Sequence, residues 1–357
     1  MNKPTSTAWQ PVVDYAHAHQ SQWSRDPQAD AASFGIHQAD DPPHNRLLGP
    51  VFARGPASGV IIVDGQERCA WGEPDRPDMT FSVTKTYLAL TAGLAFDSGL
   101  LPDLHEPIAR RLPGLGFDDP HNSQVTWEQM LQFTSEWQGS CFGVPDTVDH
   151  HRRAGFQPPA DDGPRKGSPR ALQAPGTFWE YNDVRINQFS LALLHLFGRP
   201  LPEVFGEAIM QPLGASDTWH WHGYDNSWVD IGGRPMQSVP GGGHWGGGMR
   251  IAARDQALVA RMMLEGGRAG GRQLVSQEWL RRMVTPCAIA PFYGYFTWLN
   301  QGHRPVPSAA PDDYFAVGVG AQVIWHSPQR NMVAVLRWFD FAALEGMAAR
   351  IDSALAG

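Results

Sequence analysis

Features that mark several common protein classes are missing from this chain. Its 357 residues contain no uninterrupted apolar run of about 18 residues, so the sequence predicts no membrane-spanning helix. The segment from Met1 to Trp9 lacks the apolar core of a secretory signal. The net charge is −8, whereas binding to the phosphates of nucleic acid favours a basic surface. We therefore expect neither a membrane nor a nucleic acid as a partner.

Cysteine is scarce as well. The three cysteines, Cys69, Cys141 and Cys287, are an odd number and lie far apart in the sequence. Such usage is typical of reduced thiols and not of a disulfide framework. The sequence therefore predicts a cytoplasmic protein.

Motifs of other enzyme classes are also missing. The 14 histidines form no H-E-x-x-H motif and no closely spaced ligand set with cysteine, so we predict no metal and no other cofactor. The absence of G-x-S-x-G excludes the nucleophile elbow of α/β-hydrolases. Gly241-x-Gly243-x-x-Gly246 fits the dinucleotide pattern, but Pro240 precedes it where that motif requires a strand. The cluster instead predicts a tightly turned backbone, in which His244 and Trp245 are the side chains available to line a cavity.

Lysine occurs only three times, and one copy carries the strongest chemical signal. Lys85 follows Ser82 by three residues at the start of an apolar helix, so the two side chains share a helix face. Burial at a packed helix start favours the neutral amine, which can take the proton of a hydroxyl and make it a nucleophile. This is the S-x-x-K pattern of serine acyl-transfer enzymes. The alternative is a helix N-cap at Ser82 with Lys85 in solvent.

The predicted elements occur in the order strands, helices, strands and a last helix. Residues 59–71 predict a hairpin about an Asp-Gly turn, residues 321–326 and 332–338 predict two strands, and helices are expected over 185–197, 202–213, 253–264 and 341–355. Regular β-α-β alternation is missing, which disfavours a parallel sheet. We predict an α+β fold with an antiparallel β-sheet flanked by helices. The sheet domain is expected over 1–100 and 240–357, with a mainly helical inserted domain over 101–239 and the active site between them.

Tyr181 stands at the end of a long loop rich in Pro, Gly, Asp and Arg, just before a predicted helix. A phenol near a lysine ammonium has a lowered pKa and can shuttle protons. The alternative is a packing tyrosine beside Asn182 or Asp183, either of which suits a helix N-cap.

Taken together and in this order, these motifs resemble the serine β-lactamase and penicillin-recognising superfamily. The likeness is to the class C β-lactamase-like branch, with its family VIII carboxylesterases and 6-aminohexanoate-dimer hydrolases, and it extends over residues 30–355. The matching segments are Phe81 to Lys85, Pro175 to Asn187, Gln211 to Thr218 and Gly246 to Asp255. The resemblance implies a β-lactamase/transpeptidase-like fold and catalysis by Ser82, Lys85 and Tyr181. It further implies an oxyanion hole made by the backbone N–H groups of Ser82 and Val319.

The chain departs from the family pattern at two places. Asp183 stands where the family has Asn, so a carboxylate supported by Asn182 is expected to orient Lys85 as a charged pair and to repel an anionic substrate group. Residues 316–322, with Gly318, replace the third motif and lack its cation. Both departures favour a neutral substrate.

The sequence thus predicts a serine hydrolase that cleaves a small ester or amide, with a carboxylesterase as the first expectation. The alternatives are an amidase, peptidase or β-lactamase-type enzyme, and a non-catalytic ligand-binding protein on the same fold. Trp137, Trp179 and Trp245 lie beside matched motifs and are expected to wall an apolar acyl pocket, unless they pack in the core. The oligomeric state is left open.

Overall fold

The main sheet is built from both ends of the chain. The structure, a computed structural model, describes residues 7–27, 40–158, 163–302 and 304–356. Six antiparallel strands lie in the order β12-β13-β14-β15-β1-β2. Their bounds are β1 Ser58–Val63, β2 Gln66–Trp71, β12 Trp298–Leu299, β13 Tyr314–Gly318, β14 Gln322–Ser327 and β15 Met332–Arg337. Pairing of β1 with β15 joins the two ends, as the sequence predicted.

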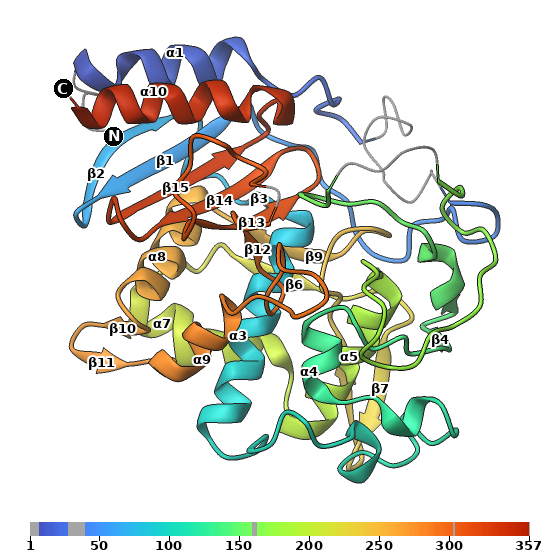
Figure 1. The fold of residues 1–357 in the computed structure, drawn as a ribbon. Coiled ribbons are helices and arrows are strands. Elements are labelled where there is room, and N and C mark those ends of the chain that lie inside the picture. Colours follow the sequence, from blue (N-terminus) through green and yellow to red (C-terminus); the bar gives the residue numbers. More distant parts are fainter. Residues whose placement is uncertain (1–6, 28–39, 159–162, 303, 357) are drawn as a thin grey trace.

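Helices cover both faces of this sheet (Figure 1). The first and last helices, α1 (Gln10–Ala18) and α10 (Leu344–Ala356), lie side by side on one face, and α8 (Ala253–Leu264) packs on the other. Because both faces are covered, every residue of β13, β14 and β15 is buried, in place of the apolar–polar alternation of a sheet with one wet face.

The remaining elements form the region below the sheet in Figure 1. Its helices are α3 (Thr84–Asp97), α4 (Trp127–Leu131), α5 (Asp183–Phe197), α6 (Leu201–Phe205), α7 (Gln211–Leu213) and α9 (Gln277–Met283). A π-helical turn, Gly206–Met210, interrupts the helix expected over 202–213. The short strands are β3 (Asp78–Met79), β4 (Ser140–Cys141), β5 (Val144–Pro145), β6 (His220–His222), β7 (Trp228–Ile231), β8 (Arg234–Gln237), β9 (Gly248–Ile251), β10 (Arg268–Ala269) and β11 (Arg272–Gln273). The sheet β3-β9-β6 joins strands from both predicted domains, and the division into domains remains a prediction.

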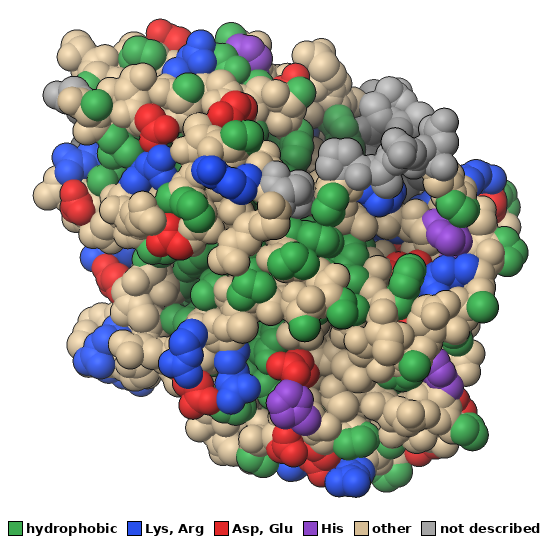
Figure 2. All heavy atoms as spheres, viewed as in Figure 1, with side chains coloured by type: hydrophobic (Ala, Val, Ile, Leu, Met, Phe, Trp, Pro, Cys, Tyr) green, Lys and Arg blue, Asp and Glu red, His purple; other side chains and the backbone are tan. Residues whose placement is uncertain are grey.

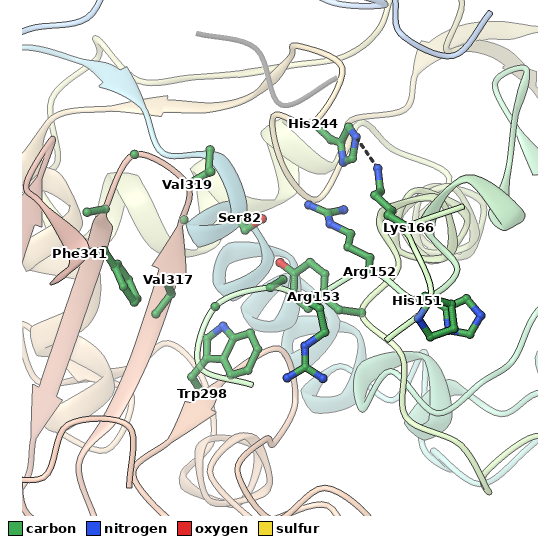
Figure 3. A pocket seen from close by; sticks show the side chains of 17 residues that line it. Ser82, His151, Arg152, Arg153, Lys166, His244, Trp298, Val317, Val319 and Phe341 are labelled. Atoms are coloured by element: carbon green, nitrogen blue, oxygen red, sulfur yellow. Dashed lines mark hydrogen bonds between the residues drawn. The ribbon is translucent and has the colours of Figure 1, made fainter. Parts of the chain in front are cut away.

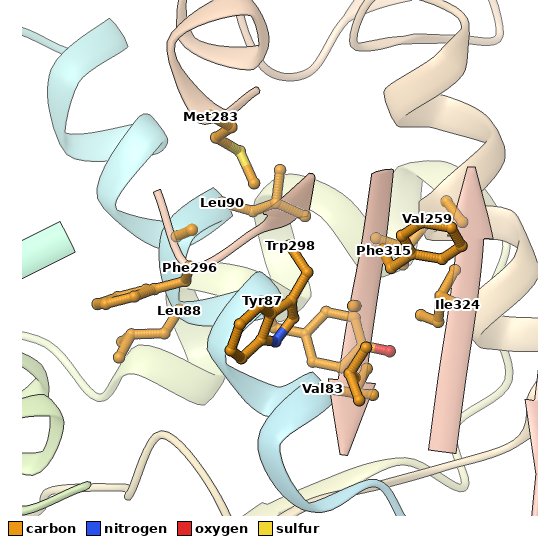
Figure 4. Packing of buried hydrophobic residues seen from close by; sticks show 14 of the residues in the cluster. Val83, Tyr87, Leu88, Leu90, Val259, Met283, Phe296, Trp298, Phe315 and Ile324 are labelled. Atoms are coloured by element: carbon orange, nitrogen blue, oxygen red, sulfur yellow. The ribbon is translucent and has the colours of Figure 1, made fainter. Parts of the chain in front are cut away.

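Helix α3 runs through the centre of the molecule. Eleven of its 14 residues are buried, and they face the sheet on one side and α9 and α5 on others. Figure 4 shows Val83, Tyr87 and Leu90 packed among side chains of the strands and of the segment before β12. A side chain at the start of this helix is therefore shielded from water.

The mixture of acidic, basic and hydrophobic side chains on the surface agrees with the composition of the sequence. On the face seen in Figure 2, acidic and basic side chains are interspersed and hydrophobic side chains gather toward the middle. Among the described residues, no helix is long and apolar enough to cross a membrane.

All three cysteines are buried and unbonded, and burial raises the pKa of the Cys69 thiol to about 12.

Candidate active site

Ser82 and Lys85 are in contact at the start of α3. Phe81 has a positive φ of 49°, rare for a bulky residue, and begins a short 3-10 turn that presents Ser82 half-buried. The Lys85 ammonium donates a hydrogen bond to the Ser82 hydroxyl over 3.0 Å. Lys85 is only 1% exposed, and the helix N-cap is Val83, without a side-chain bond. The alternative of a capping Ser82 with a solvated Lys85 is therefore wrong.

The charge on Lys85 differs from the sequence prediction. Burial by itself lowers the pKa of this amine, as expected, but Asp183 Oδ1 lies 2.6 Å from Lys85 Nζ. Burial is the largest single effect, but Asp183 and Tyr181 together outweigh it, so the pKa of Lys85 is raised above its ordinary value. The resting amine is thus an ammonium ion, in agreement with the charged pair expected from Asp183, and the neutral amine expected from burial alone is wrong.

Asp183 is the first residue of α5 and is surrounded by cations. Its second carboxylate oxygen accepts from Arg152 at 2.5 Å and lies 3.2 Å from His244 Nδ1. Burial raises the pKa of a carboxyl group, but Arg152, Lys85 and His244 together hold the pKa of Asp183 well below its usual range. Asn182 has a separate, structural role, because its side chain caps α5 by accepting from the Val184 and Arg185 amides.

Tyr181 lies beside the pair and not across the molecule from it. Its ring is nearly parallel to those of Phe133, at 4.5 Å between centroids, and Trp298, at 6.0 Å. Lys85 Nζ lies 4.9 Å from the ring centroid and the Arg152 guanidinium 5.1 Å from it. Two cations and two aromatic neighbours thus fix the phenol at the wall of the same cavity as Ser82.

That cavity has a volume of about 600 Å³ and two chemically different walls. Figure 3 shows apolar side chains on one side, basic ones on the other and Ser82 between them. The apolar wall is Trp298, Val317, Val319, Ala321 and Phe341, and the basic wall is His151, Arg152, Arg153, Lys166 and His244. The described lining residues include no carboxylate.

The predicted pocket residues divide into two groups. Gly318 and His244, both predicted for the substrate pocket, line the cavity, and so does Val319, which was predicted as an oxyanion donor. The three predicted tryptophans do not line it: Trp137 is in the core and donates to the Gly116 carbonyl, Trp179 lines a neighbouring hollow, and Trp245 lies buried beneath His244. Trp298 lines the cavity instead and supplies the aromatic wall expected from these tryptophans. It stands in β12, far from any matched motif, so motif position gave no signal for it.

Gly318 brings the end of β13 against the backbone of Ser82. A Cβ on Gly318 would lie 2.3 Å from the Thr80 carbonyl oxygen and 3.2 Å from the Ser82 nitrogen, so a side chain there would push strand and nucleophile apart. The turn that follows carries Val319 into the cavity. This close approach is what an oxyanion hole shared by the two segments requires.

The basic wall corrects the expectation of a missing cation. The degenerate third motif indeed carries none, but Arg152, Arg153 and Lys166 reach the cavity from the long loop. Sequence reasoning overlooked them because the loop lies about 70 residues from the nucleophile, beyond the range over which local spacing constrains contacts. The scarcity of lysine was a usable signal, since Lys85 and Lys166 both lie in this site.

Asp149, Asp183 and His244 offer ligand atoms within 4.8 Å of one another and are the described residues best placed to hold a metal ion. Their oxygens are already engaged by cations: Asp149 pairs with Arg152 and Lys166, and Asp183 with Lys85. A divalent cation would have to displace these positive groups, so the donor set does not suit one.

Comparisons with known proteins agree with this geometry. The model of the family described as Beta-lactamase matches residues 57–345. A 6-aminohexanoate-dimer hydrolase of Paenarthrobacter ureafaciens is 27% identical over 281 residues, which span 73% of this chain but 66% of that enzyme, less than two thirds of its length.

Solved structures share the architecture at lower identity. The hydrolase EstCE1, described as having promiscuous acyltransferase activity, superposes with a TM-score of 0.61 at 16% identity and covers 99% of this chain and 100% of its own. A beta-lactamase from Mycobacterium bovis gives 0.56 at 18% identity, over 84% and 94% of the chains. These likenesses concern the fold alone, and they confirm the predicted β-lactamase/transpeptidase-like α+β architecture.

Proposed function

This chain belongs to the beta-lactamase family of hydrolases, as its motifs predicted, and we propose that it cleaves a small ester or amide through an acyl-enzyme on Ser82. The observation that supports this proposal most directly is the 3.0 Å contact between Lys85 Nζ and Ser82 Oγ beside a cavity large enough for a small molecule.

Acylation begins when a neutral Lys85 takes the hydroxyl proton of Ser82 while Oγ forms a bond to the substrate carbonyl carbon. The backbone N–H groups of Ser82 and Val319 donate hydrogen bonds to the carbonyl oxygen and stabilise its negative charge. Collapse of this intermediate breaks the bond to the leaving group, which takes up a proton delivered through Lys85 and Tyr181. Water then attacks the acyl-enzyme by the same steps, and Ser82 regains its proton.

The charge state of Lys85 makes the pH dependence part of the proposal. Because the pKa of Lys85 is raised, the neutral amine is a minor species at neutral pH. The rate of acylation is therefore expected to rise as the pH becomes alkaline.

A carboxylesterase is the first candidate for the finer activity. The apolar wall suits a short acyl chain, and an alcohol leaves a tetrahedral intermediate with less need of protonation than an amine does. The second candidate is an amidase, favoured by the relative that hydrolyses the 6-aminohexanoate dimer. The basic wall removes the earlier argument against an anionic substrate group, so β-lactamase-type activity stays an alternative.

Hydrolysis of p-nitrophenyl butyrate by wild type and Ser82→Ala tests the proposal. We expect turnover in wild type, its loss in Ser82→Ala, and wild-type turnover in Ser353→Ala, which removes an exposed hydroxyl on α10. A fluorophosphonate should label Ser82 in wild type. Ser82-dependent release from aminoacyl anilides in place of the ester would favour the amidase. Neither turnover nor labelling would leave a non-catalytic binding protein.

A further inference from the structure

An unbroken series of polar contacts leads away from the nucleophile. Ser82 Oγ contacts Lys85 Nζ at 3.0 Å, and Lys85 contacts one oxygen of Asp183 at 2.6 Å. The other oxygen lies 3.2 Å from His244 Nδ1, and His244 Nε2 lies 2.8 Å from Asp40 Oδ2. Four segments of the chain contribute to this series, and all the side chains beyond Ser82 are buried.

The position of His244 between two carboxylates favours a positive charge on its ring. A neutral imidazole has one N–H donor and one lone pair, so its bare nitrogen would face Asp183 or Asp40, and of the described residues only Lys166, 3.4 Å from Nε2, could donate to it. A ring with both nitrogens protonated satisfies Asp183 and Asp40 at once. Trp245 supports this charge, because its indole stacks on the imidazole at 4.0 Å and donates to the same Asp40 oxygen.

The other charged groups around the histidine nearly balance. From the long loop, Asp149 and Arg152 face it, and Lys166 Nζ lies 3.4 Å from Nε2 while pairing with Asp149 and Asp40. From α3 and the start of α5 come Lys85 and Asp183, with Tyr181 adjacent. The carboxylate of Asp183 thus interacts with three groups at once: Lys85, Arg152 and His244.

We propose that His244 is a positioning residue whose positive charge competes with Lys85 for Asp183 and thereby determines the pH above which Lys85 can accept the proton of Ser82. The inference rests on the proposed function, since it assigns Lys85 as the base. Its chemistry is direct: the more of the Asp183 charge that His244 engages, the less the carboxylate stabilises the Lys85 ammonium, and the more readily the neutral amine forms. Asp40, which contacts His244, Trp245 and Lys166, holds the ring in this place.

Two neutral substitutions separate charge from hydrogen bonding. In His244→Asn the side-chain amide takes the place of Nδ1 and can still donate to Asp183. In His244→Gln it takes the place of Nε2, toward Asp40. The readout is the acidic limb, the pH range over which the rate of Ser82 phosphonylation rises, measured from about pH 6 to about pH 12 so that the plateau above the raised pKa of Lys85 is reached.

We expect the limb to move up by about one pH unit in His244→Gln, because without the cation the charge of Asp183 stabilises the Lys85 ammonium more strongly and raises its pKa. The shift should be smaller in His244→Asn, whose amide can still donate a hydrogen bond to Asp183. In an Asp183→Asn background, His244→Gln should move the limb no further, since the histidine acts through that carboxylate. A merely structural role would lower the rate at every pH without moving the limb.

The outcomes distinguish the two proposals. Labelling of Ser82 in wild type with the same limb in a folded His244→Gln protein would overturn this inference and leave the hydrolase standing. An equal shift in the Asp183→Asn background would do the same. If His244→Gln fails to fold, His244→Asn decides, and a limb at the wild-type position refutes the inference. No labelling of wild-type Ser82 would overturn the proposed function, and this inference with it.

Discussion

Asp183→Asn is the change that most directly tests how Ser82 is activated. It keeps the size of the side chain and restores the residue type expected at this position, but it removes the charge opposite Lys85. The carboxylate lies 2.6 Å from the ammonium, and the two side chains are 4% and 2% exposed. With the opposing charge gone, burial dominates and the pKa of Lys85 must fall.

The size of the effect follows from this geometry. At 2.6 Å and an effective dielectric constant of about 20, the Coulomb attraction is about 6 kcal/mol. Arg152 and His244 already contact the other carboxylate oxygen, and their positive charges offset part of this attraction. An opposite charge at this range shifts a pKa by about 1–3 units, so we expect the acidic limb of kcat/KM to move down by about 1–3 pH units. Near neutral pH the variant should then acylate about tenfold faster or more.

Stability enters the same experiment with a known sign. The pKa of Asp183 is depressed by folding, so its contribution to stability is present above the pKa of an unfolded carboxyl and is lost as the pH falls through the folded value. The pKa of Lys85 is raised, so its contribution is full below the pKa of an unfolded lysine, about 10.4, and is lost as the pH rises through the folded value. Between about pH 5 and about pH 9 both contributions are constant, and a moving limb reports catalysis and not unfolding.

The assay is stopped-flow phosphonylation of Ser82 across this pH range, with thermal unfolding of each protein as the check on folding. The variant should be less stable by up to about 3–5 kcal/mol, because three cations lose a buried partner. A folded variant whose limb coincides with that of wild type would refute the reasoning, since Asp183 would then be a structural residue of α5 and not the group that sets the charge of Lys85.

Two further predictions concern residues at the site, and a third concerns a tryptophan that lies away from it. Gly242→Ala places a methyl group 3.0 Å from Lys85 Nζ and 3.4 Å from Ser82 Oγ, so kcat should fall about tenfold or more while the melting temperature changes little; unchanged kcat would show that the contact relaxes freely. Trp298→Ala should raise KM for p-nitrophenyl butyrate and lower kcat/KM, because it removes the largest apolar lining side chain and the stacking partner of the tyrosine. Trp137→Phe should leave kcat/KM unchanged and cost about 1 kcal/mol in urea unfolding, because its indole makes a buried hydrogen bond away from the cavity.

The parts of the structure that were predictable are those encoded by neighbouring residues. The hairpin of β1 and β2 follows from an apolar run, an Asp-Gly turn and alternation. The Ser82–Lys85 contact is likewise local, because one helical turn joins the two side chains.

The parts that were not predictable depend on distant segments. Burial of Lys85 alone predicted a neutral amine, and only the resemblance to the family indicated the charged pair that α5 makes with α3 through Asp183. The tryptophans were chosen by their closeness to motifs, but β12 supplies Trp298 from the far end of the chain. Such contacts leave no periodic or spacing signal, since each pairs residues separated by about a hundred positions or more.

The presence of Asp at position 183, where the family has Asn, explains why other charged residues gather around this side chain. A carboxylate buried against the catalytic lysine would by itself make that lysine a poor base, because it stabilises the ammonium. Arg152 and a protonated His244 offset this effect, and Asp40 and Asp149 balance the added cations.

With Lys85, Arg152, Lys166 and a protonated His244 positive and Asp40, Asp149 and Asp183 negative, this buried and partly buried cluster carries four positive charges against three negative ones. The excess positive charge lies around the same cavity as Ser82, where the tetrahedral intermediate becomes negative. An Asp in place of Asn is therefore compatible with acyl transfer on the condition that the long loop and the glycine cluster bring their cations to it.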